Sequence, residues 1–265
     1  VPRDMLGREA WQEVSEAWFA GVAKWTAQVT DAARLPELLE RALLVAQSGR
    51  PGPVVLCLPE DMLFESIPTP APRAVRPALA APDEAAMQAM ARLLRESERP
   101  LMLLGGSRWS EDARARIAAF AQRECIPVAC AFRRQDRFDN AHPNYVGEAG
   151  LGINPALRDR IRDADLVLAV GTRLGDIATS HYQTLRVPHP GQRLVHVHVD
   201  ADEIGAVYRP DVGICADVVR FAERLCDDPG DAARVDARRA WLAAARDDYL
   251  RWSVPTRLPG SLQLG

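Results

Sequence analysis

Helix-like and strand-like patterns of hydrophobic residues alternate along this chain. The first clear helix begins near residue 35, with Pro36 in its first turn, apolar residues along one face and Gly49 just past its end. Residues 54–58 (VVLCL) are then continuously apolar, which is typical of a strand buried on both faces of a parallel sheet. The helix, the Pro/Gly turn and the strand therefore predict half of a βαβ unit.

A second series of alternating elements begins near residue 83 and contains five short apolar runs. Alternation with helical stretches predicts a parallel sheet with helices on both faces and right-handed crossovers. We expect strands at residues 101–104, 127–131, 166–170, 194–199 and 212–215, and helices at residues 83–95, 110–123, 155–162, 202–207, 217–226 and 232–252. The predicted fold class is α/β, a doubly wound, Rossmann-like parallel sheet preceded by part of a second α/β domain.

A change of composition separates the two series. Prolines at positions 68, 70, 72, 77 and 82 make residues 64–82 typical of an extended linker. We therefore expect three parts: a first domain at residues 1–62, a linker at residues 63–82 and a central domain at residues 83–228. Residues 229–265 are predicted to be a helix and a linker that lead into a further domain.

The stretch before the first clear helix is less regular. A short helix is expected at residues 8–19, and no clear strand pattern is present in residues 1–33. Trp11, Trp18 and Trp25 lie among charged residues here. Three tryptophans in so short a stretch predict that this part of the chain packs against something.

Composition limits the classes of function. The 265 residues are 48% hydrophobic and 26% charged, with a net charge of -3. This is the composition of a globular protein, and its interspersed charges form no basic patch that would bind nucleic acid or an anionic membrane. No apolar run approaches the ~20 residues of a membrane span. The five cysteines form no Cys-x-x-Cys pair, and apolar runs around Cys57, Cys130 and Cys215 indicate buried thiols in a reduced, cytoplasmic setting.

Two turns after predicted strands are candidate ligand sites. Gly105 and Gly106 lie between a strand and a helix, where backbone amides face a phosphate in many α/β proteins. The pair lacks the third glycine of G-x-G-x-x-G, and a tight turn requires glycine for steric reasons alone. The turn VGTRLGD, residues 170–176, offers Arg173 and Asp176. Either a ligand or an internal Arg173–Asp176 ion pair explains these two charges, and we expect the ion pair to order the loop.

The segment LVHVHVDADEIG, residues 194–205, places two histidines on one face of a predicted strand. His196 and His198 suggest a metal site by their i, i+2 spacing. An interior strand of a parallel sheet has no room for an open metal site, and the following acids are typical helix-capping residues. We therefore predict no metal here. Asp200, at the end of the strand, is the better candidate, as a ligand of a ribose hydroxyl.

Four segments together resemble landmarks of thiamine diphosphate (ThDP)-dependent enzymes of the acetolactate synthase type. They are GRPGPVVLCLPED at residues 49–61, DADLVLAVGTRLGD at residues 163–176, LVHVHVDADEIG at residues 194–205 and ADVVRFAERL at residues 216–225. The first resembles the end of the pyrimidine-binding domain, and the others resemble the central domain, in the order and spacing of the family. The opening VPRDMLGREAWQE and the residues around Lys24 are similar to the acetolactate synthase branch.

The resemblance implies roles for individual residues. Gln12 and Lys24 match residues that line the substrate channel, and Trp11 stands where the branch usually has Phe. In flavin-bearing members the central domain holds FAD through positions that match Gly105, Gly106, Arg173, Asp200 and Asp217.

The chain departs from the flavin-binding pattern in three places. Ile177 replaces a common Arg, His198 replaces a common Asp, and the loop at residues 131–150 replaces a Gly-rich flavin-facing loop. That loop carries Arg133 and Arg134 beside Asp136. FAD is thus a candidate cofactor that we expect not to bind tightly.

The resemblance also implies the chemistry of a larger enzyme. A Glu drives formation of the thiazolium ylid of ThDP, which attacks a 2-oxo acid, and Mg2+ anchors the diphosphate. By the resemblance, that Glu and the Gly-Asp-Gly to Asn segment for Mg2+ lie outside the chain. We therefore expect an internal, catalytically inactive fragment of a ThDP- and Mg2+-dependent 2-oxo acid carboligase or decarboxylase.

Further expectations follow for cofactors and partners. The substrate is expected to be a small-molecule 2-oxo acid, and the assembly a homodimer or homotetramer, without nucleic acid or membrane. The central domain is expected to be structural or nucleotide-binding. The alternative is a free-standing domain that binds a dinucleotide, FAD or NAD.

Overall fold

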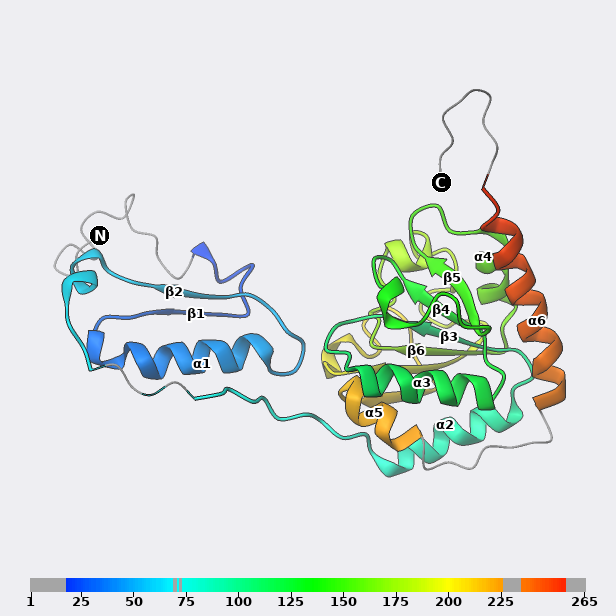
Figure 1. The fold of residues 1–265 in the computed structure, drawn as a ribbon, viewed down its shortest axis with the longest axis horizontal. Helices are drawn as coiled ribbons and strands as arrows, with labels where there is room; N and C mark the ends of the chain where they lie inside the picture. Colours follow the sequence, from blue (N-terminus) through cyan, green and yellow to red (C-terminus); the bar gives the residue numbers. More distant parts are fainter. Residues whose placement is uncertain (1–17, 69–70, 72, 226–234, 256–265) are drawn as a thin grey trace, which may run out of the picture. The chain divides into compact units, whose positions relative to one another are not determined.

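The computed structural model describes residues 18–68, 71, 73–225 and 235–255, which divide into two compact units between Leu79 and Ala80 (Figure 1). Trp11, Gln12 and most of the helix expected at residues 8–19 lie outside the described residues. We call the part before the division unit 1 and the part after it unit 2.

Unit 1 is a small βαβ unit. Strand β1 (Trp25–Gln28) and strand β2 (Val54–Cys57) pair in parallel, and helix α1 (Leu35–Gln47) connects them. Short 3-10 helices, η3 (Ala32–Arg34) and η4 (Glu60–Phe64), follow the two strands. The helix and β2 are confirmed, whereas β1 was not predicted, because four residues of mixed polarity carry little periodic signal.

The tryptophans of unit 1 differ in their surroundings. Trp25 packs against a core formed by Val29, Ala32, Leu38 and Met62, and the Arg41 guanidinium lies 5.1 Å from the centre of its ring. Trp18, in contrast, is 65% exposed. The expected packing is therefore present for Trp25 and absent for Trp18 among the described residues.

Unit 2 is built on a parallel sheet of six strands. They are β3 (Pro100–Leu104), β4 (Val128–Ala131), β5 (Tyr145–Ala149), β6 (Leu166–Val170), β7 (Arg193–His198) and β8 (Val212–Cys215). Their order is β5-β4-β3-β6-β7-β8, so that the chain first winds outward to β5 and then returns to continue from β6 in the other direction. This confirms the doubly wound fold, and it places the topological switch point between β3 and β6.

Helices cover both faces of this sheet (Figure 1). On one face, α2 (Glu84–Glu96), α3 (Glu111–Arg123) and α5 (Val218–Leu225) bury Met90, Phe120 and Phe221 against the sheet. On the other face, α4 (Pro155–Asp163) and α6 (Val235–Trp252) contribute Ile161 and Ala245 to a second core. Asp83, Ser110 and Asn154 accept hydrogen bonds from backbone N–H groups in the first turns of α2, α3 and α4, which explains where these helices begin.

Helix α6 is part of unit 2. Trp241 Nε1 donates to the carbonyl of Pro100 at 2.9 Å, and Arg160 on α4 forms a 2.7 Å ion pair with Asp248. Arg246 donates to the carbonyl of Tyr145 at 2.6 Å. These contacts fix α6 to β3, α4 and β5.

Three predicted features of unit 2 require correction. Strand β5 lies in the region expected to be a loop, and the helix expected at residues 202–207 is a single 3-10 turn, η7 (Ala201–Glu203). Cys130 is buried, and burial raises the pKa of its thiol to about 12, whereas Cys215 is exposed on the edge strand β8. Cys125, Cys130 and Cys215 are free thiols.

Candidate functional site

The backbones of two loops meet at the switch point of unit 2. Gly105 and Gly106 follow β3, and Gly171 and Thr172 follow β6. A Cβ atom at Gly106 would lie 2.3 Å from the carbonyl oxygen of Gly171, and one at Gly171 would lie 2.7 Å from that of Gly105. Gly106 and Gly171 also have positive φ angles of 72° and 73°. The glycines are therefore required by the close approach of the two loops.

Side chains of the chain itself cover the carbonyl groups of the Gly105-Gly106 turn. Trp109 Nε1 donates to the carbonyl oxygen of Gly105 at 2.8 Å. Arg137, from the loop after β4, donates through Nε to that of Gly106 at 3.4 Å and forms a 2.7 Å ion pair with Asp136. The turn is thus bonded to two further segments of unit 2.

Asp217, at the start of α5, lies beside the same turn. Its side chain is 3% exposed, accepts a hydrogen bond from the backbone N of Val219 at 2.9 Å and lies 3.4 Å from Nε of Arg108. Arg108 itself has a positive φ of 64°. The neighbouring Val218 side chain lies 3.1 Å from the position of a Cβ atom at Gly171. Asp217 therefore caps α5 and joins it to the loop after β3.

The ion pair expected between Arg173 and Asp176 is absent, and each residue has another partner. Arg173 lies 3.9 Å from Glu203 of η7, and Asp176 pairs with His181 at 3.0 Å. The Arg173, Asp176 and His181 side chains are 55%, 51% and 74% exposed, so water screens both contacts. The expectation was wrong because the loop turns after Leu174, whose φ is 54°, and Asp176 then pairs locally with a residue five positions later.

Asp200 is a capping residue of η7. Its side chain accepts a hydrogen bond from the backbone N of Asp202 at 3.1 Å, and its own backbone N donates to Nδ1 of His198. Because Arg173 pairs with Glu203 of the same turn, Asp200 and Arg173 lie near one another at the carboxyl ends of β6 and β7. Gly105, Gly106 and Asp217 lie at the switch point, where a Cβ atom at Gly105 would meet Thr172, the residue before Arg173, at 2.7 Å.

The two histidines of β7 are buried. His196 Nε2 lies 2.9 Å from the carbonyl oxygen of Thr172, so Nε2 carries the proton and Nδ1 is unprotonated. Burial lowers the pKa of His196, and the hydrogen bond to Thr172 opposes this only in part. No group of three His, Cys, Asp or Glu side chains among the described residues is arranged to hold a metal ion.

Lys24 lies at the beginning of β1 in unit 1. Its Nζ donates to the carbonyl oxygens of Ser48 and Arg50, the latter at 3.0 Å, in the turn that follows α1. A cation at this place complements the unsatisfied carbonyl groups at the carboxyl end of a helix. Trp11 and Gln12, the other two residues matched to a substrate channel, lie outside the described residues.

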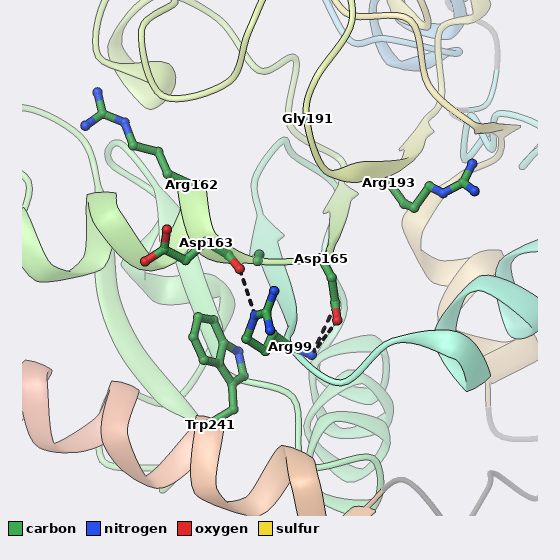
Figure 2. A pocket seen from close by; sticks show the side chains of 8 residues that line it. Arg99, Arg162, Asp163, Asp165, Gly191, Arg193 and Trp241 are labelled. Atoms are coloured by element: carbon green, nitrogen blue, oxygen red, sulfur yellow. Dashed lines mark hydrogen bonds between the residues drawn. The ribbon is translucent and has the colours of Figure 1, made fainter.

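An open cavity of about 740 Å³ lies at the amino ends of β3, β6 and β7, on the edge opposite to the switch point (Figure 2). Asp165 there accepts hydrogen bonds from the backbone N of Glu98 and Arg99. The Arg162 and Arg193 side chains point away from Arg99 and Trp241. The cavity is lined by Arg99, Arg162, Asp163, Ala164, Asp165, Gly191, Arg193 and Trp241. Because the charged groups do not point toward a common centre, we interpret the cavity as a gap where the ends of several elements meet, and not as a ligand site.

Sequence reasoning missed Arg108, Trp109 and Arg137 at the switch point. Arg108 and Trp109 directly follow the Gly-Gly turn, and a Trp and an Arg so close to it are a usable signal. Arg137 lies 31 positions from Gly106, and only the pairing of β3 with β4 brings it there.

Comparison with known proteins identifies the family of this fold. Residues 87–225, just over half of the 265 residues, match the family of the thiamine pyrophosphate enzyme, central domain. Among the described residues, every helix is too short or too polar to span a bilayer.

Relatives align with both units of the chain. A probable sulfoacetaldehyde acetyltransferase of Rhizobium meliloti is 31% identical over 93% of this chain and 42% of its own length. Acetolactate synthase isozyme 1 large subunit of Escherichia coli K12 is 30% identical over 82% of the chain and 38% of its own length. Glyoxylate carboligase of Escherichia coli O157:H7 is 28% identical over 92% of the chain and 42% of its own length. The chain thus spans about two fifths of these relatives, and it belongs to the thiamine pyrophosphate enzyme family, whose central domain it contains.

Proposed function

We propose that this chain is an internal part, with a structural role, of a ThDP- and Mg2+-dependent enzyme. The whole enzyme would transfer an acyl or related carbon unit from a small 2-oxo acid or a related donor. The observation that carries the proposal is that the alignments extend beyond the central domain into unit 1. A free-standing dinucleotide-binding domain would align over unit 2 alone. The same observation therefore argues against the alternative interpretation.

The described residues do not fit a site for Mg2+ and the diphosphate. Mg2+ in proteins takes oxygen ligands from a few carboxylates and from the phosphate groups of the substrate or cofactor. The described residues contain no cluster of His, Cys, Asp or Glu that could hold a metal, and the sequence has no Gly-Asp-Gly segment. We propose that other parts of the polypeptide supply the groups that bind ThDP and Mg2+. The ylid chemistry of ThDP then belongs to the whole enzyme.

The contribution of unit 2 under this proposal is a rigid support. Its helices cover both faces of the sheet, and the helix that leads out of the unit, α6, is bonded to β3, α4 and β5. These contacts hold α6 in place on the sheet of unit 2. A homodimer or homotetramer remains part of the proposal, and light scattering of the full polypeptide measures it.

The proposal is tested by the turnover of the full polypeptide. After removal of bound cofactor with a chelator and dialysis, turnover of pyruvate, glyoxylate or sulfoacetaldehyde should require the return of both ThDP and Mg2+. Release of carbon dioxide with formation of a new carbon–carbon bond identifies a carboligase, and transfer of an acetyl group identifies an acetyltransferase. Two outcomes would contradict the proposal: turnover that does not require ThDP, or the absence of turnover with all three of these donors.

The 265-residue chain alone is the matched control. Incubated with ThDP, Mg2+ and pyruvate, it should form neither carbon dioxide nor acetolactate nor acetoin above a protein-free sample. Turnover by this chain would show that its own carboxylates activate ThDP, which contradicts the structural role assigned to it.

A further inference from the structure

We propose that the chain's own side chains close the switch point of unit 2, so that unit 2 keeps its structure without a bound dinucleotide. In doubly wound sheets the ligand binds in the crevice between the loops that follow the strands at the switch point. In this chain those are the loops that follow β3 and β6. Both loops contain the glycines that normally let a backbone approach a pyrophosphate.

Here the glycines allow the two loops to approach each other. The 2.3 Å and 2.7 Å separations calculated for added Cβ atoms place the Gly106 and Gly171 backbones in van der Waals contact. A pyrophosphate group cannot lie between two backbones at that separation. The glycine pattern is therefore accounted for without a ligand.

The N-terminus of α3, where a pyrophosphate would be held, is also already satisfied. Ser110 Oγ accepts a hydrogen bond from the backbone N of Ala113 at 3.0 Å, and Glu111 and Asp112 lie in the first turn. The partial positive charge of a helix N-terminus attracts anions. These two carboxylates pair with Arg114 and Arg116 of the same helix at 3.6 Å and 2.7 Å, so the Ser110 cap, and not charge repulsion, is what occupies this end of α3.

The positive charges near the switch point have anionic partners as well. Arg108 lies 3.4 Å from Asp217, and Arg137 lies 2.7 Å from Asp136. Trp109 and Arg137 donate to the carbonyls of Gly105 and Gly106. Arg137 and Asp217 are thus positioning residues that tie the loop after β4 and the start of α5 to the turn after β3.

The direct test is binding of nucleotides to the unaltered chain. Equilibrium dialysis with FAD, NAD and ADP should show no saturable binding at micromolar concentrations, and the nucleotides should not shift the Tm. A ligand present at about a hundredfold excess over its Kd would raise the Tm by several degrees. Saturable binding of any of the three with a micromolar Kd would overturn the proposal.

Two variants test whether the contacts close the switch point. Arg137→Gln and Asp217→Asn should each lower the Tm in the absence of any nucleotide, whereas Arg133→Gln, an exposed residue of the same loop, should not. If Asp217→Asn does not fold, Arg137→Gln still decides the question. A Tm unchanged in Arg137→Gln would show that its contacts do not brace the switch point.

The outcome is separate from that of the proposed reaction. In the full polypeptide, ThDP-dependent turnover should be the same with and without added FAD. Nucleotide binding with unchanged ThDP dependence would contradict the closed switch point alone. Loss of ThDP dependence without nucleotide binding would contradict the proposed reaction alone.

Discussion

Arg238 of α6 and Glu124, directly after α3, form a buried ion pair in which Nη1 lies 2.9 Å from Oε2 and the side chains are 0% and 3% exposed. Arg238 also donates to the backbone carbonyls of Ser97 and Leu94, at the end of α2. One guanidinium thus satisfies groups at the carboxyl ends of two helices, where carbonyls lack partners within the helix. The pair holds α6 on unit 2 at a point remote from the switch point.

Replacement of Arg238 should therefore destabilise the protein strongly. We expect Arg238→Met to lower the free energy of unfolding by about 3–5 kcal/mol, because the buried Glu124 carboxylate keeps only the more exposed Arg123 as a partner and the Ser97 and Leu94 carbonyls lose their donor. Urea denaturation followed by circular dichroism measures this. Arg239→Met, at the next and 69% exposed side chain, should change it by less than about 0.5 kcal/mol. Equal effects of the two variants would show that the buried pair adds no stability.

A methyl group at Gly106 should disrupt the contact between the loops after β3 and β6. Gly106→Ala forces a left-handed conformation on a residue with a side chain and places its Cβ atom against the Gly171 carbonyl. We expect a loss of about 2–4 kcal/mol in the free energy of unfolding. Gly191→Ala is the control, since a Cβ atom there has no neighbour within 4 Å. A small effect at Gly106 would mean that the two loops separate easily.

Removal of the Asp176 carboxylate should have little effect on stability. The internal pair with Arg173 that would have made it important is absent, and the His181 partner is 74% exposed. We expect Asp176→Ala to change the free energy of unfolding by less than about 0.5 kcal/mol, the range of exposed pairs. A loss above about 1 kcal/mol in urea denaturation would show that Asp176 orders the loop after β6.

The sequence predicted the strands with a strong apolar or alternating pattern and missed β1 and β5, whose patterns are weaker. Residues 166–170 are a strand because five apolar residues follow one another between helix and turn signals. Strand β5, YVGEA, contains a glycine with a φ of 119° and a glutamate, so its pattern does not stand out. Glu148 is accommodated because it accepts hydrogen bonds from the backbone N of Arg133 and from Gln135. Such a local compensation is visible only after the loop has folded.

The meeting of the loops after β3 and β6 was predictable in its location but not in its contacts. The glycine turns after β3 and β6 mark the switch point, because ligands and close contacts both require small residues there. The partners of those turns come from elsewhere: Arg137 from the loop after β4, and Asp217 from the start of α5. Side-chain pairs so distant in the sequence depend on the strand order, which periodicity does not specify.

Burial of His196 should make the stability of the protein depend on pH below neutrality. Burial lowers the pKa of its imidazole in the folded state, whereas the unfolded chain has the ordinary value of about 6.5. As the pH falls below that value, the unfolded state binds the proton first, so the free energy of unfolding decreases until the pH has passed below the folded-state pKa. The expected slope from this residue is up to about 1.4 kcal/mol per pH unit.

Urea denaturation at pH 7.5 and at pH 5.5 measures this effect. The loss of stability between the two pH values should be smaller in His196→Gln than in the unaltered chain, even though the variant is less stable at pH 7.5. His142, whose pKa burial also lowers, contributes a separate part, which His142→Gln removes. If the loss of stability between the two pH values is the same in His196→Gln as in the unaltered chain, then the fold does not hold His196 in its neutral form.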